Sequence, residues 1–191
     1  MSDSKIEIND LIKQLKDEDP EIRKQAADNL AEISDDKIIE PLISALSDEN
    51  PQVRFKSAQA LGNQGESAVE PLVAMISKEE GEIRRYATFA LKKIGSPSAV
   101  DYFIKALHDD DWGVRKVAAR SLGELGDKKA LGSLIESLED EDWGVRLAVI
   151  RSLGDFGDES AVDPLKKASR KEKDKDFKKA VNKALKKIQS S

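Results

Sequence analysis

The chain has 191 residues, of which 36% are charged, 39% are hydrophobic and 5% are aromatic. It contains no cysteine and one histidine, which excludes disulfides, thiolate nucleophiles and thiolate metal sites. The formal net charge is −5, but residues 161–191 hold 11 Lys and Arg against 4 Asp and Glu, so the upstream part carries −12. That acidic part disfavours general nucleic-acid binding.

The N-terminus, MSDSKIEIND, has neither the basic start nor the apolar stretch of a signal peptide. No segment approaches the roughly 18 consecutive apolar residues that a membrane span requires. These features predict a cytoplasmic protein that does not enter a membrane.

One stretch recurs along the chain. DDDWGVRKVAARSLGELG, at residues 109–126, returns 31 residues later as DEDWGVRLAVIRSLGDFG, at residues 140–157. Weaker copies begin at Asp17 and Asp48. Self-similarity at this period indicates stacked repeat units, each of which buries its apolar face against its neighbours.

Each repeat is predicted to contain two helices, the first with apolar residues at i, i+3, i+4 and i+7 and the second with a narrower stripe of small residues. In chain order, the first buried residues of the units are predicted to be Ile8, Ile39, Val69, Val100, Leu131 and Val162. The six repeats then cover about residues 5–36, 37–66, 67–97, 98–128, 129–159 and 160–191. The predicted fold is all-α, with one domain of six helix pairs over residues 1–191.

Several second helices carry clear boundary signals. Asp19-Pro20 and Asn50-Pro51 each place a capping side chain before a proline at the first helical position. Glycines at positions 65, 95, 126 and 157 are predicted to end the second helices. The connections are therefore only a few residues long.

The motif G-D-x-x-A-V-x-P-L, present as GDESAVDPL at residues 157–165, occurs together with D-x-D-x-x-V-R in the second helices. This combination resembles the HEAT-like repeats of the phycobilin (PBS) lyase type over essentially the whole chain. It is also similar to artificial repeat proteins built on the same consensus. The resemblance implies a right-handed α-solenoid, an α-α superhelix whose second helices line the concave face, and a use in protein–protein contact.

The resemblance also implies a structural ladder, in which a turn aspartate and the arginine six residues later connect neighbouring units. A guanidinium fork held by turn carbonyls and a carboxylate can be buried between units. The matching pairs are Asp17 and Arg23, Asp48 and Arg54, Asp109 and Arg115, and Asp140 and Arg146. The third unit has Lys78 opposite Arg84, which predicts an interrupted ladder and a softer joint near residues 65–84, where the repeat step is also one residue short.

The acidic clusters at residues 109–111 and 139–142 could be mistaken for metal ligands or a general acid/base pair. They recur just before helix N-termini, where carboxylates cap amides and complement the helix dipole, so they are interpreted as caps. The HEAT-like enzyme deoxyhypusine hydroxylase depends on repeated His-Glu pairs, and none occurs in this sequence. His108 is predicted to be an exposed turn residue, and no catalytic residue, metal site or cofactor is predicted.

The candidate binding surface consists of second-helix positions two, three and six residues after the buried Val or Ile, which point away from the core. Two tryptophans in the first turns of second helices extend it, although stacking over the neighbouring turns as hydrophobic lids is an open alternative. The predicted partner-binding residues are Phe55, Arg85, Tyr86, Phe89, Trp112, Lys116, Arg120, Trp143, Leu147 and Arg151.

These residues predict a non-enzymatic scaffold or adaptor that binds another protein through an acidic segment with apolar anchors. The alternative is a subunit of a phycobilin-lyase-like or other modifying enzyme complex. The lysine-rich C-terminal segment, FKKAVNKALKKI, is interpreted as a solvated cap or as a patch for an anionic partner. It is the one segment for which nucleic-acid binding is kept as an alternative.

Overall fold

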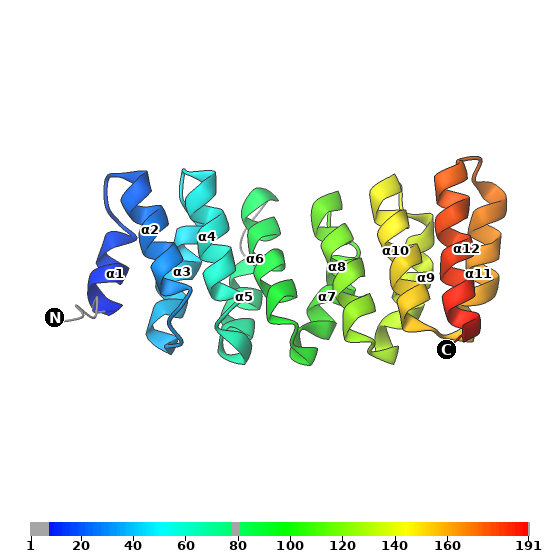
Figure 1. The fold of residues 1–191 in the computed structure, drawn as a ribbon, viewed down its shortest axis with the longest axis horizontal. Coiled ribbons are helices and arrows are strands. Elements are labelled where there is room, and N and C mark those ends of the chain that lie inside the picture. Colours follow the sequence, from blue (N-terminus) through cyan, green and yellow to red (C-terminus); the bar gives the residue numbers. More distant parts are fainter. Residues whose placement is uncertain (1–7, 78–80, 191) are drawn as a thin grey trace. The chain divides into compact units, whose positions relative to one another are not determined.

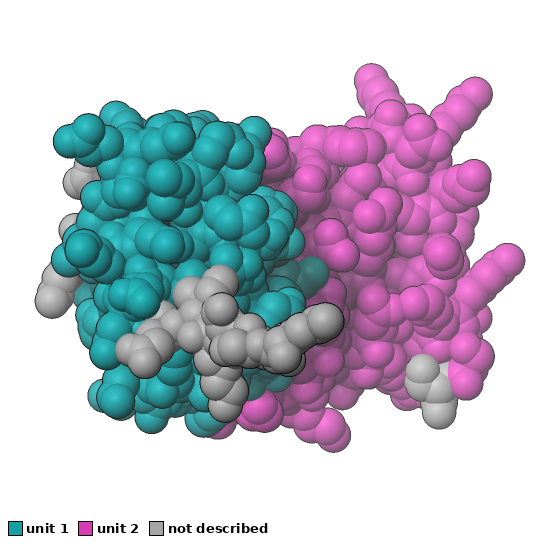
Figure 2. Space-filling view, turned by 60° about the vertical axis from the view of Figure 1, so that its left-hand side comes forward, with its two compact units in different colours: residues 1–96 teal, residues 97–191 magenta. Residues whose placement is uncertain are grey.

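The computed structural model describes residues 8–77 and 81–190, and these residues form twelve α-helices and no β-strand. The predicted all-α fold is therefore confirmed. Residues 1–96 and 97–191 make two compact units, which Figure 2 colours separately. Each unit contains three helix pairs, and one continuous array over residues 1–191 stays a prediction.

In the first unit, α2 packs against α4 and α4 packs against α6, so its second helices lie side by side (Figure 1). The first helices α1, α3 and α5 each pack on the second helix that follows. The bounds are α1 Ile8–Gln14, α2 Pro20–Leu30, α3 Ile39–Ser44, α4 Pro51–Leu61, α5 Val69–Ile76 and α6 Gly81–Ile94.

The second unit repeats the arrangement, with α8 against α10 and α10 against α12. Its first helices α7, α9 and α11 pack on α8, α10 and α12 respectively. The bounds are α7 Val100–Ala106, α8 Trp112–Leu125, α9 Leu131–Glu136, α10 Trp143–Phe156, α11 Val162–Lys171 and α12 Lys175–Ser190.

The six residues predicted as the first buried positions are the first residues of α1, α3, α5, α7, α9 and α11 in the structure. From the second pair onward a short 3-10 helix leads into each first helix. Asp127 and Asp158 form two of these turns, because each carboxylate accepts a hydrogen bond from the amide two residues later. The residues at which the first helices begin are therefore set by local side-chain hydrogen bonds as well as by apolar spacing.

Several boundaries of the second helices lie where the sequence predicts them. Asp19 and Asn50 accept hydrogen bonds from the amides two residues later, and a proline occupies the first helical position after each. Asp111 caps α8 through the amide two residues later, and Asp142 caps α10 through the amide three residues later. Helices α8 and α10 end at Gly126 and Gly157, whose φ values of 65° and 73° are left-handed and favour glycine. Gly65 does not end α4 as predicted, because α4 already ends at Leu61 and Gly65 begins the 3-10 helix that leads into α5.

Small residues allow neighbouring second helices to approach closely. A Cβ added to Gly123 of α8 would lie 2.7 Å from the Cα of Ser152 in α10. One added to Gly154 of α10 would lie 2.8 Å from the Cα of Ala184 in α12. Larger side chains there would separate helices that bury residues such as Leu122, and each fully buried side chain of that size contributes about 1.5–3 kcal/mol.

Candidate partner-binding surfaces

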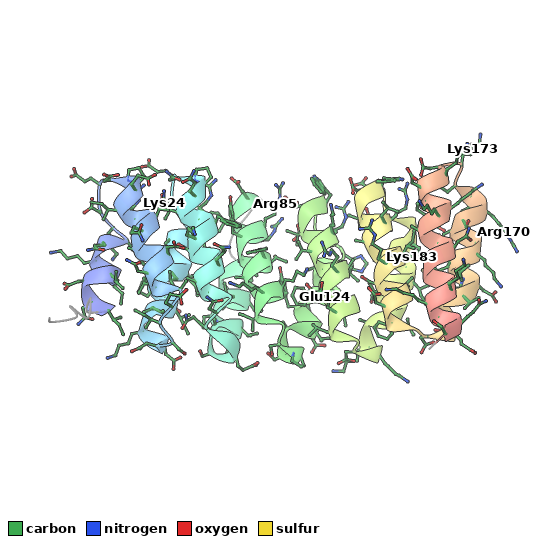
Figure 3. The ribbon with its side chains drawn as sticks, in the orientation of Figure 1. Lys24, Arg85, Glu124, Arg170, Lys173 and Lys183 are labelled. Carbon is green, nitrogen blue, oxygen red and sulfur yellow. The ribbon has the colours of Figure 1, made fainter. Side chains whose placement is uncertain are left out.

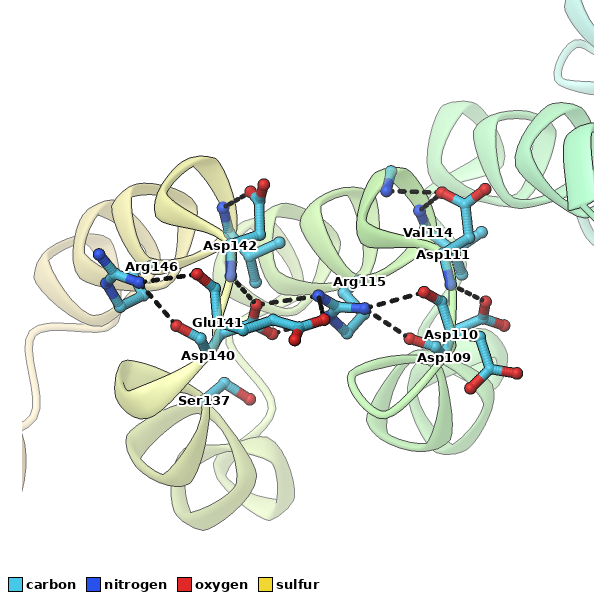
Figure 4. Close-up of polar contacts among 12 residues, drawn as sticks. Asp109, Asp110, Asp111, Val114, Arg115, Ser137, Asp140, Glu141, Asp142 and Arg146 are labelled. Atoms are coloured by element: carbon cyan, nitrogen blue, oxygen red, sulfur yellow. Dashed lines mark hydrogen bonds and ion pairs between the residues drawn. The ribbon is translucent and has the colours of Figure 1, made fainter.

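A buried arginine joins α8 to the turn before α10 (Figure 4). Arg115 donates from Nη1 to the carbonyl oxygens of Asp109 and Asp110 at 2.9 and 3.1 Å. It also donates from Nε and Nη2 to the carboxylate of Asp140 at 2.8 and 3.1 Å. The side chains of Arg115 and Asp140 are only 8% and 7% exposed, and the hydrogen bond to Asp140 raises the pKa of Arg115 above its ordinary value. We call this set of contacts a rung.

The same rung occurs in the first unit. Arg23 donates to the carbonyl oxygens of Asp17 and Glu18 and, through Nε and Nη2, to the carboxylate of Asp48 at 2.7 and 3.0 Å. The hydrogen bond to Asp48 raises the pKa of Arg23. In each rung, therefore, the arginine's own turn supplies carbonyl oxygens, and the carboxylate comes from the turn of the next pair.

Two rungs use a different acid. Arg146 bonds the carbonyl oxygens of its own turn and contacts Glu172 at 3.4 Å. Arg54 pairs with Glu82, in the first turn of α6, at 2.8 Å, but the Glu82 side chain is 56% exposed. The Nε of Arg54 has no hydrogen-bond acceptor among the described residues. Lys78, where an interrupted ladder is predicted, lies outside the described residues, so the softer joint stays a prediction.

The acidic clusters serve these rungs and the helix caps. Asp111 caps α8 through the amides of Gly113 and Val114, while Asp109 accepts a hydrogen bond from the amide of Asp111. His108 is exposed in the turn after α7. The residues that the structure describes contain no group of three or more His, Asp and Glu side chains placed to hold a metal ion.

In the first unit, four predicted binding residues gather on α4 and α6. Phe55 is 43% exposed, and its ring lies 5.9 Å from that of Phe89, centroid to centroid. The guanidinium of Arg54 lies 5.4 Å from the ring centroid of Tyr86, close enough for a cation–π contact. Arg85, labelled in Figure 3, is exposed on the same helix. This group of aromatic and cationic side chains is the first-unit cluster.

In the second unit, the other six predicted residues lie on α8 and α10. Trp112 and Trp143 begin these helices and are 48% and 43% exposed. The Nζ of Lys116 lies 5.5 Å from the ring centroid of Trp112, also within cation–π range. Arg120 and Arg151 are exposed, and Leu147 is half-buried. These six residues form the second-unit cluster, and almost half of each tryptophan remains accessible.

A hollow of about 500 Å³ extends this cluster to the C-terminal helix. We call it the C-terminal hollow. Its lining residues are Trp143, Leu147, Arg151 and Asp155 of α10 with Asp176, Lys179, Ala180, Lys183, Ala184 and Lys187 of α12.

The α12 side of this hollow was not among the predicted site residues, although the sequence contains a signal for it. Phe177 is buried at the position that Val or Ile occupies in the other second helices. Counting two, three and six residues from Phe177 gives Lys179, Ala180 and Lys183, and all three line the hollow. The count of two, three and six residues after the buried position, which gives the predicted binding residues on the other second helices, therefore also gives the α12 side of the hollow.

No helix in the described part of the chain is both long enough and apolar enough to cross a membrane.

Comparison with known proteins gives a consistent result. The family model for HEAT repeats matches residues 8–92, 69–139 and 114–186. A chain in the complex of CpcE and CpcF of phycocyanin lyase from Nostoc sp. PCC7120 is 27% identical, with a TM-score of 0.71, and the match covers 78% of this chain and 99% of that one. Among curated proteins no match was found.

Two artificial proteins share the fold at lower identity. An engineered protein is 24% identical, with a TM-score of 0.60, and the match covers 100% of this chain and 98% of that one. A designed armadillo repeat protein in complex with the peptide (KR)4 is 19% identical, with a TM-score of 0.63, and the match covers 95% of this chain and 99% of that one. Together with the twelve helices, these matches confirm the predicted class, an α-solenoid built from HEAT-like pairs.

Proposed function

Because the chain belongs to the HEAT repeat family, we propose that it is a non-enzymatic scaffold that binds another protein through the exposed faces of its second helices. Repeat folds of this kind present extended surfaces, so a partner can be held by contacts spread over several helices. The two binding surfaces are the first-unit cluster on α4 and α6 and the second-unit cluster on α8 and α10.

The observation that carries this proposal is the location of exposed large apolar side chains. Among the described residues there are four, namely Ile22, Phe55, Trp112 and Trp143, and every one lies on a second helix. Ile22 occupies the position that Val53 buries in the next pair, and no preceding second helix is described that could cover it. The three aromatic residues have no such explanation, because they lie within stacked pairs.

The cations beside these rings indicate the chemistry of the partner. Arg85, Lys116, Arg120 and Arg151 lie among the aromatic side chains of the two clusters, while the part of the chain upstream of residue 161 carries −12 overall. Aromatic and arginine residues supply most of the binding energy in protein interfaces. Local positive charge on an acidic body would steer an acidic segment toward the clusters and away from the rest of the surface.

The structural uses of the acidic residues support a non-enzymatic role. Asp111 and Asp142 cap helices, and Asp48 and Asp140 neutralise buried arginines. Helix capping and the pairing of buried arginines stabilise the fold, so these carboxylates have structural roles that require no catalytic function.

The test is affinity capture from a native lysate of the source organism, with the protein as bait. Replacing Phe55, Trp112 and Trp143 together by alanine should abolish capture of the partners while the thermal unfolding temperature changes little, because these side chains contribute little to packing between pairs. The control is Ile22→Ala, which removes an exposed apolar side chain outside the clusters and should capture the same partners as the wild type. Unchanged capture by the triple variant would contradict the proposal.

A second candidate function is a subunit of a lyase-like complex, which the 27% identity to a chain of the CpcE–CpcF complex favours. This protein would then work with a partner subunit on a chromophore-bearing substrate. Visible absorbance in the purified protein, or chromophore transfer that depends on this chain when its partners are present, would support that role. Capture of partners without either property would support the scaffold role.

A further inference from the structure

The C-terminal hollow has an apolar interior. Trp143 and Leu147 of α10 face Ala180 and Ala184 of α12 across it. Ala184 also lies close to Gly154 of α10, where the two helix backbones approach each other. A hollow of about 500 Å³ is within the usual size range of ligand pockets and can receive one large apolar side chain.

The rim of the hollow is cationic. Arg151, Lys179 and Lys183 are exposed there, and none of the three forms an ion pair with another described residue. Lys187, one turn further along α12, is already paired with Asp155. Figure 3 labels Lys183 on the side of α12 that faces α10.

The spacing of the lysines on α12 adds to the difference between the paired Lys187 and the unpaired Lys179 and Lys183. Lys179, Lys183 and Lys187 are four residues apart and so lie on one face of α12, where like charges repel one another and destabilise the helix. The carboxylate of Asp155 relieves this repulsion at Lys187. A carboxylate supplied by a ligand would do the same at Lys179 and Lys183.

The charges also distinguish between classes of anionic ligand. Four cations and two carboxylates line the hollow, which gives it a net charge of +2. Asp155 and Asp176 on the rim would repel the evenly spaced phosphates of a nucleic acid. A peptide can place separate carboxylates at the unpaired cations and insert an apolar side chain between them.

We propose that the C-terminal hollow binds an acidic peptide segment of a partner protein, with one aromatic or large aliphatic side chain inserted between α10 and α12 and flanking carboxylates at Arg151, Lys179 and Lys183. The lysine-rich helix is then a wall of the binding site as well as the end of the second unit. This inference rests on the proposed function, because it specifies the partner chemistry at one of the two surfaces.

The test measures fluorescence anisotropy of a labelled ten-residue peptide of Glu and Asp with one central Phe. The wild type should bind it, and replacing Lys179 and Lys183 by alanine should weaken binding about tenfold. The matched control replaces Lys175 and Lys186, which lie on α12 outside the hollow, and should weaken binding less than about threefold because it removes the same charge from the same helix. Trp143→Ala should also weaken binding about tenfold, through loss of the apolar wall.

Several results would overturn the inference. Equal loss in the two lysine pairs would mean general attraction to a basic helix, and equal binding of a peptide with Ala in place of Phe would mean that nothing enters the hollow. Tighter binding of a ten-nucleotide oligouridylate would assign the patch to nucleic acid. Absence of saturable binding up to about 1 mM, the range of a weak contact, would also exclude the site.

The test of the C-terminal hollow and the test of the proposed scaffold function can fail independently. Lysate capture that depends on Phe55 and Trp112 but not on Lys179 and Lys183 would overturn only the inference about the hollow. Binding of the Phe-containing peptide with the expected variant pattern, but without any captured partner, would support the hollow and contradict the scaffold role.

Discussion

Replacing Asp140 by asparagine is expected to destabilise the second unit by about 3 kcal/mol, because it leaves a buried arginine without its carboxylate. The Asp140 carboxylate accepts hydrogen bonds from Nε and Nη2 of Arg115 and from the amide of Asp142, at 2.8, 3.1 and 2.8 Å. Breaking a buried ion pair costs about 3–5 kcal/mol. The lower end applies because two carbonyl oxygens and Glu141, at 3.3 Å, still bond Arg115.

The matched control is Glu82→Gln, which removes the carboxylate from the Arg54 rung. Its N–O distance of 2.8 Å equals the Nε–Oδ2 distance of the Arg115 rung, but the Glu82 side chain is 56% exposed, whereas that of Asp140 is 7% exposed. Exposed pairs contribute about 0–1 kcal/mol, so this change should cost no more than about 1 kcal/mol. The comparison separates the effect of burial from the effect of distance.

Urea unfolding gives the free energies, and hydrogen exchange shows which helices lose protection. For Asp140→Asn the protection of α8 and α10 should fall most, and the unfolding temperature should drop by roughly 6–12 °C for a chain of this size. Equal destabilisation by the two substitutions would refute the reasoning, because burial of the acceptor would then not determine the strength of a rung.

Gly123→Ala should destabilise the second unit by about 1–3 kcal/mol through overpacking, because the added Cβ would lie 2.7 Å from a backbone atom of α10. Gly132→Ala, at an exposed position of α9 with nothing within 4 Å, should instead stabilise it by roughly 0.5–1 kcal/mol, and thermal unfolding of both variants tests the contrast. Hydrogen bonds from the amides of Asp174 and Lys173 hold the pKa of Glu172 below its ordinary value of 4.5, so its stabilisation is complete above that value and is lost as the pH falls through the lower folded pKa. Glu172→Gln should therefore lower the unfolding temperature at neutral pH and reduce its acid dependence, and a variant with the wild-type pH profile would contradict this assignment.

The helix pairs could be predicted from the sequence because the repeat supplies independent signals at the same positions. Val69 and Val100 begin first helices where the 31-residue period places them, and Asn50 caps a second helix where Asn-Pro predicts a start. Apolar spacing and capping residues indicate the same helices, and such agreement between independent signals makes a fold predictable from its sequence.

The acceptor of Arg54 and the α12 wall of the C-terminal hollow could not be predicted, because they depend on contacts between helices that sequence spacing does not specify. The acceptor of Arg54 is Glu82, inside the first turn of α6, although the other rungs use acids of the preceding turn. For the α12 wall the sequence predicts either a solvated cap or a patch for an anionic partner, because Phe177 replaces the usual Val or Ile and lysines surround it. Whether a lysine is a solvated surface residue or lines a hollow depends on the neighbouring helix, and one sequence does not reveal that.

In the second unit, stability and the proposed binding surface depend on the same short segment. Asp140 holds Arg115 and also accepts a hydrogen bond from the amide of Asp142, and Asp142 in turn caps α10 at Trp143. The rung therefore fixes the first turn of the helix that carries the exposed indole into the C-terminal hollow. A side chain held in place before binding loses less conformational freedom when a ligand arrives, so the buried ladder prepares the surface that we propose to be functional.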